Sequence, residues 1–140
     1  MLCRVLYDNT LSEWFPVKSV VRQGCILSPI LFLVIIDWSM RKTTSDKTRG
    51  IQWNLFSHLE HLDFADDLAL PSINRSNLQE KTAKLETYAK QTGLNINKTK
   101  TQVMCINATP TAPITGTGEP LKFVDDFTYL GSLISKDNGA

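Results

Sequence analysis

The sequence predicts an α+β domain, and three segments in chain order support that prediction. Residues 28–43 have the length and start signal of a helix, and residues 74–92 have an amphipathic helical pattern. Between them, residues 59–70 form two short apolar runs on either side of a tight turn, which is typical of a β-hairpin. The order of helix, hairpin, helix and short strands favours a two-layer fold, an antiparallel sheet with helices on one face, over an alternating parallel sheet.

The first helix is predicted from its start signal and its apolar run. Ser28 can act as the N-cap, and Pro29 suits the first helical position because its missing N–H would have no partner there. The residues that follow are mostly apolar, so we expect a helix that is buried on most sides and ends near Thr43. The apolar run over residues 26–36 is well short of the roughly 20 residues that a membrane span needs. We therefore expect no membrane partner.

The hairpin between the helices has an acidic tip. Its turn contains Asp66 and Asp67, and Pro71 closes the second strand because proline cannot donate to a strand ladder. We predict that both aspartates lie at the tip of the hairpin. We also predict that Leu62 and Phe64 point into a core shared with the first helix.

The second helix is amphipathic and is expected to end at Gly93, which suits a C-cap. Its apolar face should pack on the sheet through Leu78, Leu85 and Ala89, and its polar face should leave Lys84 and Glu86 in water. The apolar positions are Leu78, Leu85, Tyr88 and Ala89, and the polar ones are Gln79, Glu80, Lys84 and Glu86.

The two ends of the chain have weaker patterns. Residues 1–21 predict the end of a helix followed by an extended pair. After the second helix, short strands are expected at residues 94–96 and 103–106, and a loop rich in Thr, Pro and Gly is expected over residues 108–120. A final pair of extended segments is expected around Phe123 and from Phe127 to Leu133.

Composition limits the class of protein. The chain has 140 residues, 42% of them hydrophobic, which suits a single domain or part of one. The formal net charge is +1, so any nucleic-acid binding must come from a local site and not from an overall basic field. Three widely spaced cysteines favour neither a disulfide framework nor a zinc cluster. We expect reduced thiols in an intracellular protein, cytoplasmic or nuclear.

The aspartate pair is the sharpest chemical signal in the sequence. Two carboxylates at a hairpin tip can present oxygens to Mg²⁺, which binds through one or two carboxylates together with substrate phosphates. Taken alone, Asp66 and Asp67 favour an ordinary solvated turn over a metal site, because aspartate suits turns. A hydrolase that uses the pair as acid and base is disfavoured, because adjacent residues cannot straddle a glycosidic bond at the required spacing of roughly 5 to 9.5 Å.

Three further motifs accompany the FADD sequence of residues 64–67. Residues 21–32 read VRQGCILSPILF, residues 93–97 read GLNIN with Lys100 and Thr101 just beyond, and residues 127–132 read FTYLGS. This ordered set resembles the palm of reverse transcriptases encoded by retrotransposons that lack long terminal repeats. The resemblance extends over nearly the whole chain and implies that residues 1–140 are part of a polymerase palm with RNA-directed DNA polymerase chemistry.

The resemblance also implies roles for individual residues. Asp66 and Asp67 match the catalytic aspartates that bind metal, which implies Mg²⁺ as the cofactor with Mn²⁺ as an alternative. The implied partners are an RNA template, a DNA primer and deoxynucleotides. Residues that match the nucleotide and template site are Arg22, Gln23, Gly24, Phe64, Ala65 and Lys100, and those that match the primer grip are Phe127, Tyr129, Leu130 and Gly131.

Several of these residues also have a purely structural interpretation. Gly24 suits a simple turn, Lys100 suits a solvated surface, and Phe127 and Tyr129 suit a sheet core. The polar pair His58 and His61 flanks the hairpin without a third ligand at metal spacing, so we interpret both as strand surface residues.

The chain departs from the family pattern in ways that affect activity. Family palms contain an earlier strand with a further metal-binding aspartate, and no stretch before Arg22 matches it; Asp8 lies in a different context. Fingers and thumb are also missing, and Pro71 stands where the family commonly has leucine. We therefore expect a partial palm that is inactive alone. The alternative is a non-catalytic retroelement remnant or a small binding module.

Overall fold

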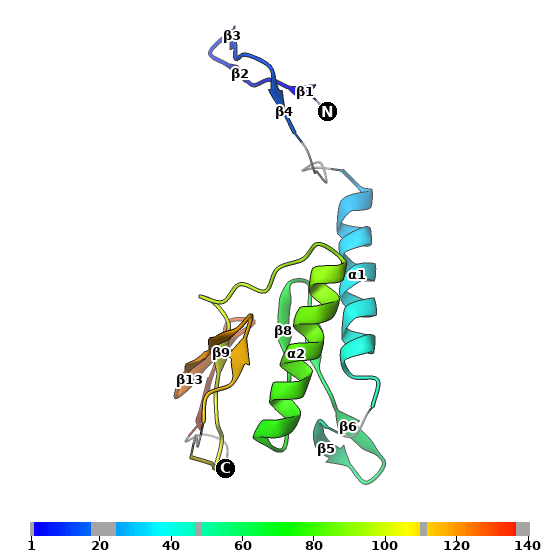
Figure 1. The fold of residues 1–140 in the computed structure, drawn as a ribbon, viewed down its shortest axis with the longest axis vertical. Helices are drawn as coiled ribbons and strands as arrows, with labels where there is room; N and C mark the ends of the chain where they lie inside the picture. The colour runs from blue at the N-terminus through cyan, green and yellow to red at the C-terminus, as the bar shows by residue number, and fades with distance from the viewer. Residues whose placement is uncertain (1, 18–24, 47–48, 110–111, 137–140) are drawn as a thin grey trace. The chain divides into compact units, whose positions relative to one another are not determined.

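The computed structural model describes residues 2–17, 25–46, 49–109 and 112–136, which fall into two units, residues 1–32 and 33–140 (Figure 1). Two helices of 17 residues each are joined to short strands, so the predicted α+β class is confirmed. In the described part of the chain, neither helix is long and apolar enough to cross a bilayer.

The first unit begins with a nested pair of antiparallel ladders. Strand β1 (Leu2–Cys3) pairs with β4 (Phe15–Pro16), and β2 (Leu6–Tyr7) pairs with β3 (Thr10–Leu11). The turn at Asp8 and Asn9 has φ values of 46° and 59°, the left-handed backbone that a tight type I′ hairpin turn needs. The predicted helix end over these residues is therefore wrong, because a turn that Asp and Asn tolerate reverses the chain.

Helix α1 (Leu27–Thr43) ends where the sequence predicts, but it starts one residue before Ser28, so Ser28 is not its cap. The prediction of burial on most sides is wrong. Ile36 and Met40 are buried, whereas Leu33 and Val34 are 52% and 60% exposed. The reason is geometric: the buried residues Ile36, Ser39, Met40 and Thr43 are three or four positions apart, so a single stripe of the helix is covered.

Two hairpins follow α1. Strands β5 (Ile51–Asn54) and β6 (Ser57–Leu59) pair with a register shift, and β7 (Leu62–Phe64) pairs with β8 (Asp67–Ala69). At the start of β5 the backbone of Gly50 passes so close to the Leu59 carbonyl that any Cβ at Gly50 would overlap it. Glycine is therefore required at this crossing.

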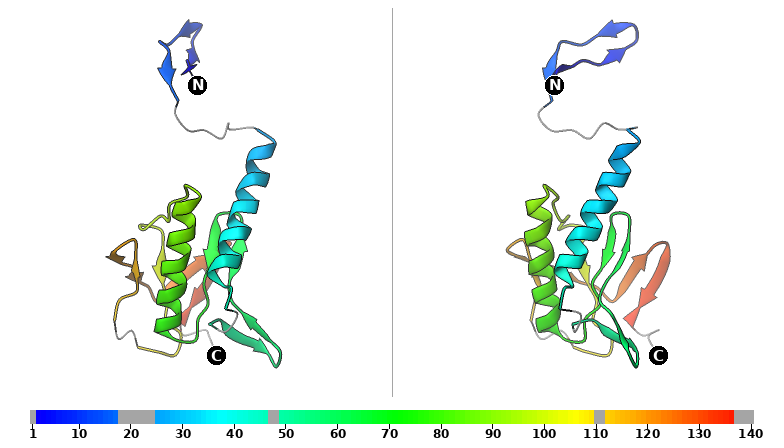
Figure 2. Two further views of the ribbon diagram at one scale, coloured as in Figure 1. Left: turned by 45° about the vertical axis from the view of Figure 1, so that its right-hand side comes forward. Right: turned by 90° about the vertical axis from the view of Figure 1, so that its right-hand side faces the viewer.

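Helix α2 (Arg75–Gln91) confirms the predicted helix of residues 74–92. The Asn74 side chain caps it by accepting a hydrogen bond of 2.9 Å from the Asn77 N–H. Gly93 follows the helix with φ 78°, a left-handed conformation that suits glycine. The rings of Trp38 and Tyr88 meet edge to face with centroids 5.7 Å apart, and α1 and α2 lie side by side in Figures 1 and 2.

A small apolar core lies between α2 and the segments after it. Strand β9 (Gln102–Val103) pairs in parallel with β12 (Lys122–Phe123), and β10 (Thr115–Gly116) forms a hairpin with β11 (Glu119–Pro120). Buried Val103, Ile114 and Leu121 pack with the partly buried Leu78 and Phe123. The predicted loop of residues 108–120 thus contains a hairpin flanked by core residues. The structure shows no strand over residues 94–96, and the one expected over 103–106 is confined to β9.

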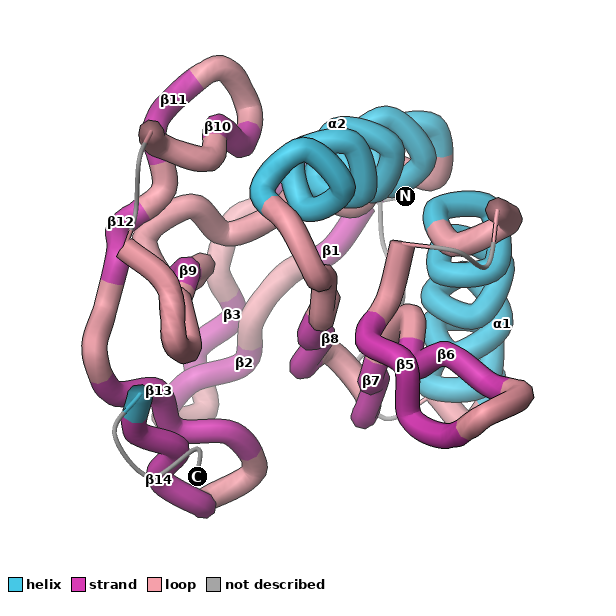
Figure 3. The backbone as a smooth tube through the Cα atoms, turned by 90° about the horizontal axis from the view of Figure 1, so that it is seen from below, coloured by secondary structure: helices cyan, strands magenta, loops and turns pink. Residues whose placement is uncertain are grey.

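The last hairpin is formed by β13 (Asp126–Tyr129) and β14 (Ser132–Ser135). Across the described residues the strands form seven two-stranded ladders, drawn separately in Figure 3, and not one antiparallel sheet; β9–β12 is parallel. Each segment that was predicted to form a hairpin pairs with another strand. The expected continuous sheet is absent from the described part of the chain.

Candidate active site

The aspartate pair lies at the end of the β7–β8 hairpin. Phe64 pairs with Asp67, so Ala65 and Asp66 form a two-residue turn between the strands. The prediction that both aspartates stand at the tip is confirmed. Because paired residues share a face, Asp67 is on the same face of the hairpin as Phe64. The residue before Phe64, Asp63, is on the other face.

The tip is open and locally strained. Ala65 has φ 54°, a left-handed backbone that glycine adopts more readily than alanine. The side chains of Asp66 and Asp67 are exposed, and neither takes part in an ion pair among the described residues. A cavity of about 350 Å³ beside Cys105 and Lys136 lies elsewhere in the chain. The carboxylates are therefore accessible to a cation and its water or phosphate ligands from outside.

The hairpin strands themselves are not part of a core. Leu62 is 42% exposed and Phe64 is 64% exposed, so the prediction that both point into a core shared with the first helix is wrong. The ladder of β7 and β8 has no further strand on either side in the described chain. Leu68 and Ala69 in β8 are half-buried, and polar contacts at the base of the hairpin connect it to α2.

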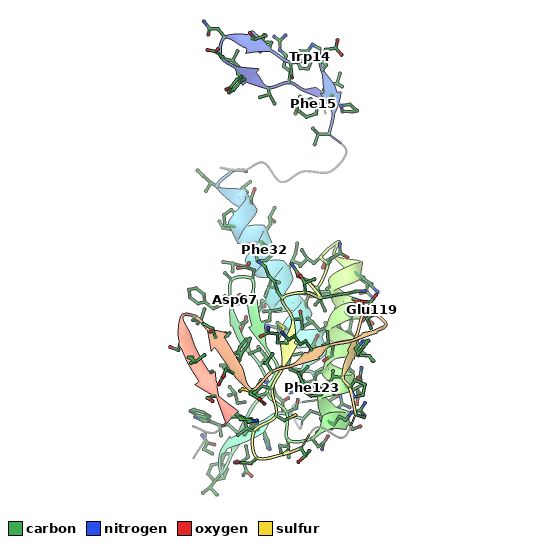
Figure 4. All side chains as sticks on the ribbon, turned by 90° about the vertical axis from the view of Figure 1, so that its left-hand side faces the viewer. Trp14, Phe15, Phe32, Asp67, Glu119 and Phe123 are labelled. Carbon is green, nitrogen blue, oxygen red and sulfur yellow. The ribbon has the colours of Figure 1, made fainter. Side chains whose placement is uncertain are left out.

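The β13–β14 hairpin lies next to this tip (Figures 2 and 4). Burial raises the pKa of Tyr129, and the negative charges of Asp67 and Asp63 raise it further. The Tyr129 phenol therefore lies within range of the charges of both carboxylates on the aspartate hairpin. The structure therefore brings together the two motifs that the sequence placed 60 residues apart.

The four residues predicted for the primer grip occupy one hairpin. The rings of Phe127 and Tyr129 stack on the same face of β13 with centroids 6.3 Å apart. Leu130 and Gly131 form the two-residue turn with φ 48° and 82°, so both central positions are left-handed, as a type I′ turn requires. Gly131 suits that turn, and Leu130 is held in it with its side chain 53% exposed.

The remaining predicted residues are less closely connected. Arg22, Gln23 and Gly24 lie outside the described residues. Lys100 is exposed at the end of a turn in which the Asn97 side chain accepts hydrogen bonds from the Thr99 and Lys100 N–H groups, at 3.1 and 3.2 Å. Among the described residues, the Lys100 side chain forms no ion pair and no hydrogen bond with the aspartate hairpin.

The family model for reverse transcriptase (RNA-dependent DNA polymerase) matches residues 1–134. The chain belongs to the reverse transcriptase family. No solved structure matches it. The match covers all four motifs, including the aspartate hairpin and the Tyr129 hairpin, so the neighbouring positions of these two hairpins can be considered in terms of polymerase chemistry.

Reverse transcriptases use divalent metal ions, and the residues at the tip fit one in part. Asp66 and Asp67 offer unpaired, exposed carboxylate oxygens, which are the ligands that hard cations such as Mg²⁺ prefer. No group of three or more His, Cys, Asp or Glu side chains in the described chain could enclose a metal ion. The pair can therefore hold one side of a cation, and further ligands must come from substrate, water or residues beyond those described.

One feature of this reverse transcriptase segment was missed by sequence reasoning. Lys81 on α2 is fully buried, and its ammonium lies 2.7 Å from the Glu60 carboxylate. Burial alone would raise the pKa of Glu60, but hydrogen bonds from Lys81 and from the Gly50 and Arg49 backbone hold it below its usual range. The available signal was spacing: Lys81 lies three residues after Leu78 and four before Leu85, on the apolar face of the helix.

Ion pairs surround this buried contact. Arg49 bridges Asp46 at 2.5 Å and Glu80 at 2.7 Å, and Lys84 bridges the same two carboxylates at 2.8 and 3.4 Å. The prediction that Lys84 and Glu86 lie in water is wrong. Glu86 accepts a hydrogen bond of 2.7 Å from the Thr117 N–H and pairs with Lys90. The polar side of α2 thus binds the loops on either side of it.

Proposed function

We propose that this chain supplies the aspartate hairpin and the primer-grip hairpin of an RNA-directed DNA polymerase palm, of the kind encoded by retrotransposons without long terminal repeats. The observation that supports this most strongly is the proximity of Tyr129 to Asp67 and Asp63 within a chain that matches the family over residues 1–134. In such a palm, one hairpin holds the metal-binding carboxylates and the other holds the primer.

The reaction proposed for the complete enzyme is transfer of a nucleotide to a primer 3′ hydroxyl, with RNA as template and deoxynucleotides as substrates. Bound Mg²⁺, or Mn²⁺ in its place, would supply charge stabilisation for the transferring phosphate. Asp66 and Asp67 would hold metal through their exposed oxygens. Ala65 is small beside them and would leave room for the primer end, and exposed Phe64 would lie against the nucleotide.

Other proposed contacts follow the motifs. Phe127, Tyr129, Leu130 and Gly131 would hold the primer strand with the stacked rings and the tight turn described above. Lys100 would meet nucleotide phosphates, which its exposed position leaves accessible. Arg22, Gln23 and Gly24 are proposed to lie against template base and incoming nucleotide.

We further propose that these 140 residues do not polymerise alone. Two-metal chemistry needs ligands on both sides of the reacting phosphate, and one hairpin supplies one side. Loss of preorganised charge stabilisation at a single position costs about 10² to 10³ in rate. Loss of surfaces that orient template and primer removes an entropic contribution of up to roughly 7 kcal/mol. The two deficits together should leave no measurable extension.

A second candidate is a non-catalytic remnant or a small nucleic-acid-binding module. The observation that favours it is that the described residues contain no group of three or more His, Cys, Asp or Glu side chains that could hold a metal ion. Such a module would bind a primer–template duplex through the β13–β14 hairpin without chemistry. We also propose an intracellular location, cytoplasmic or nuclear, which is consistent with Cys3 and Cys105 forming no disulfide among the described residues.

Primer extension tests the proposal. The 140-residue chain is assayed with Mg²⁺ and with Mn²⁺, alone and after fusion to a palm strand that carries a further aspartate and to fingers, beside an Asp66→Asn, Asp67→Asn control. We expect no extension by the chain alone, extension by the completed protein, and loss of that extension in the control. Extension by the completed protein that survives both substitutions would contradict the assignment. Duplex binding without extension in every form would favour the binding module.

A further inference from the structure

The Lys81 side chain connects α2 to both ends of the aspartate hairpin. Its ammonium donates to the Glu60 carbonyl at 2.8 Å and to the Pro71 carbonyl at 2.9 Å, and it forms the ion pair with the Glu60 carboxylate. The ammonium thus donates hydrogen bonds to two carbonyls and is also close to one carboxylate oxygen of opposite charge. Glu60 lies two residues before β7 and Pro71 lies two residues after β8.

The position of Pro71 explains why a lysine is needed there. In the ladder, Leu62 pairs with Ala69, so continuing the register by two residues on each strand places Glu60 opposite Pro71. A residue at that position would normally donate its N–H across the ladder, and proline has none. The Lys81 ammonium takes the place of that donor at the Glu60 carbonyl. Pro71, a departure from the family pattern, is thus accommodated by a specific contact.

From these contacts we propose that Lys81 is a positioning residue, which holds the two ends of the aspartate hairpin on α2 and thereby fixes where Asp66 and Asp67 stand. The proposal rests on the function proposed above for the two aspartates. Lys81 touches neither aspartate, so its effect would pass through the two strands. The side chains of β7 are exposed, Leu68 and Ala69 in β8 are half-buried, and the two strands pair only with each other in the described chain, so the ends of the hairpin are where specific polar contacts can fix the tip.

The partner of Lys81 is itself held in place. The second carboxylate oxygen of Glu60 accepts a hydrogen bond of 3.1 Å from the Arg49 N–H, and Arg49 also pairs with Glu80 on α2. The next residue, His61, has its ring nitrogen 3.3 Å from the Thr44 hydroxyl. The clamp, defined as Lys81, Glu60 and the Pro71 carbonyl, is therefore anchored to the loop after α1 as well as to α2.

Amide hydrogen exchange of the purified 140-residue chain tests the clamp. Lys81→Met keeps the length and apolar stem of the side chain and removes its three donors. Because it leaves the Glu60 charge unpaired, a second variant combines Glu60→Gln with Lys81→Met, which removes both charges. Lys84→Met is the matched control, since Lys84 lies on the same helix and pairs with Asp46 and Glu80 but not with the hairpin.

The readout is the exchange rate of amides in β7 and β8 relative to those in the middle of α2. We expect this ratio to rise several-fold in the double variant and to stay unchanged in Lys84→Met. Mn²⁺ affinity, measured by electron paramagnetic resonance, should fall by up to about 10-fold in the double variant, as for loss of groups that orient metal ligands. A purely structural ion pair would speed exchange equally in the hairpin and α2, leaving the ratio constant.

The exchange ratio and the metal titration separate two kinds of failure. An unchanged ratio in the double variant overturns the clamp, whatever the metal result. Equal Mn²⁺ binding by the unmodified chain and by an Asp66→Asn, Asp67→Asn variant overturns the proposed function, while a raised ratio would still show that Lys81 fixes the hairpin. If Lys81→Met alone does not fold, the double variant gives the decisive ratio.

Discussion

Two hairpins are attached to α2 by different kinds of contact. The β10–β11 hairpin is flanked by buried Ile114 and Leu121, and Gln79 bonds to its backbone with Oε1 2.8 Å from the Thr115 N and Nε2 2.9 Å from the Thr115 O. The β7–β8 hairpin has an exposed first strand and a half-buried second strand, and it is held at its base by the buried Lys81. One hairpin is therefore part of the core, and the other extends from it.

The two kinds of contact have different effects: apolar burial mainly stabilises the fold, and the polar contacts mainly fix the position of a hairpin. Burial of apolar side chains is non-directional, so it stabilises the β10–β11 region without requiring an exact geometry. A buried ion pair with hydrogen bonds contributes little net stability compared with apolar packing, but its geometry is specific. If the hairpin presents two carboxylates to a metal, as proposed, fixed ends serve that role better than a hydrophobic face. Substitutions in the two regions, and the pH dependence of stability, test this contrast.

Replacing Lys81 with Met should give the largest loss of stability. The variant leaves the Glu60 carboxylate buried without its cation, and removal of one partner from a buried pair costs about 3 to 5 kcal/mol. Urea denaturation followed by circular dichroism measures the change. The combined Glu60→Gln, Lys81→Met variant should recover much of that loss, because no unpaired charge remains. Equal stability of the single variant and the unmodified chain would show that the pair is not buried as described.

Ile114→Ala tests the apolar side of the comparison. Ile114 is 2% exposed in the core cluster, so truncation should cost about 2 to 5 kcal/mol. The matched control is Leu133→Ala, because Leu133 is 70% exposed on β14 and its truncation should change stability by less than about 0.5 kcal/mol. Thermal melts of both variants measure the two changes in stability. Similar melting temperatures for the two would contradict the core assignment.

The pH dependence of stability should report on the clamp. The pKa of Glu60 is held below its ordinary value of 4.5 in the folded chain. Its contribution is therefore fully present above that value and is lost as pH falls through the lower folded pKa. Denaturant midpoints measured from pH 7 to pH 3 should fall less steeply in the acid range for Glu60→Gln than for the unmodified chain. Parallel acid profiles would mean that Glu60 is not stabilised as a carboxylate.

Ala65→Gly should have the smallest effect and the opposite sign. Ala65 is held at φ 54°, and glycine removes a left-handed backbone cost of about 1 to 2 kcal/mol, partly offset by glycine's larger entropy loss of about 0.5 to 1 kcal/mol on folding. A net gain of at most about 1.5 kcal/mol is expected in urea denaturation. Gly118→Ala in the β10–β11 turn, at φ 80°, is the counterpart and should destabilise. A loss in the first variant would refute the strain at the tip.

The sequence predicted the elements whose signals are local. The bounds of α2 followed from its amphipathic pattern and from Gly93, and the aspartate tip followed from two apolar runs around a turn. Each of these features is fixed by neighbours a few residues away in the chain. The family resemblance then supplied the link between the aspartate hairpin and the Tyr129 hairpin, which no local pattern contains.

Features that depend on distant partners were not predicted. The burial of Lys81 was not predicted, because it depends on the oxygens of Glu60 and Pro71, which lie 21 and 10 residues away. Leu62 and Phe64 looked like core residues, because alternation along a strand does not reveal whether anything covers its apolar face. The β10–β11 hairpin was concealed by a loop-like composition, although Thr117 and Gly118 form its tight turn.

A Mn²⁺ titration of the 140-residue chain, followed by electron paramagnetic resonance, tests whether the tip of the β7–β8 hairpin binds metal. The unmodified chain is compared with Asp66→Asn, Asp67→Asn and with Asp125→Asn, Asp126→Asn, a second adjacent aspartate pair outside the β7–β8 hairpin. We predict that Mn²⁺ binding is lost in the first variant and retained in the second. Binding that survives the Asp66 and Asp67 substitutions, or that depends on the Asp125 pair instead, would contradict the assignment of the hairpin tip as the metal-binding part of a reverse transcriptase palm.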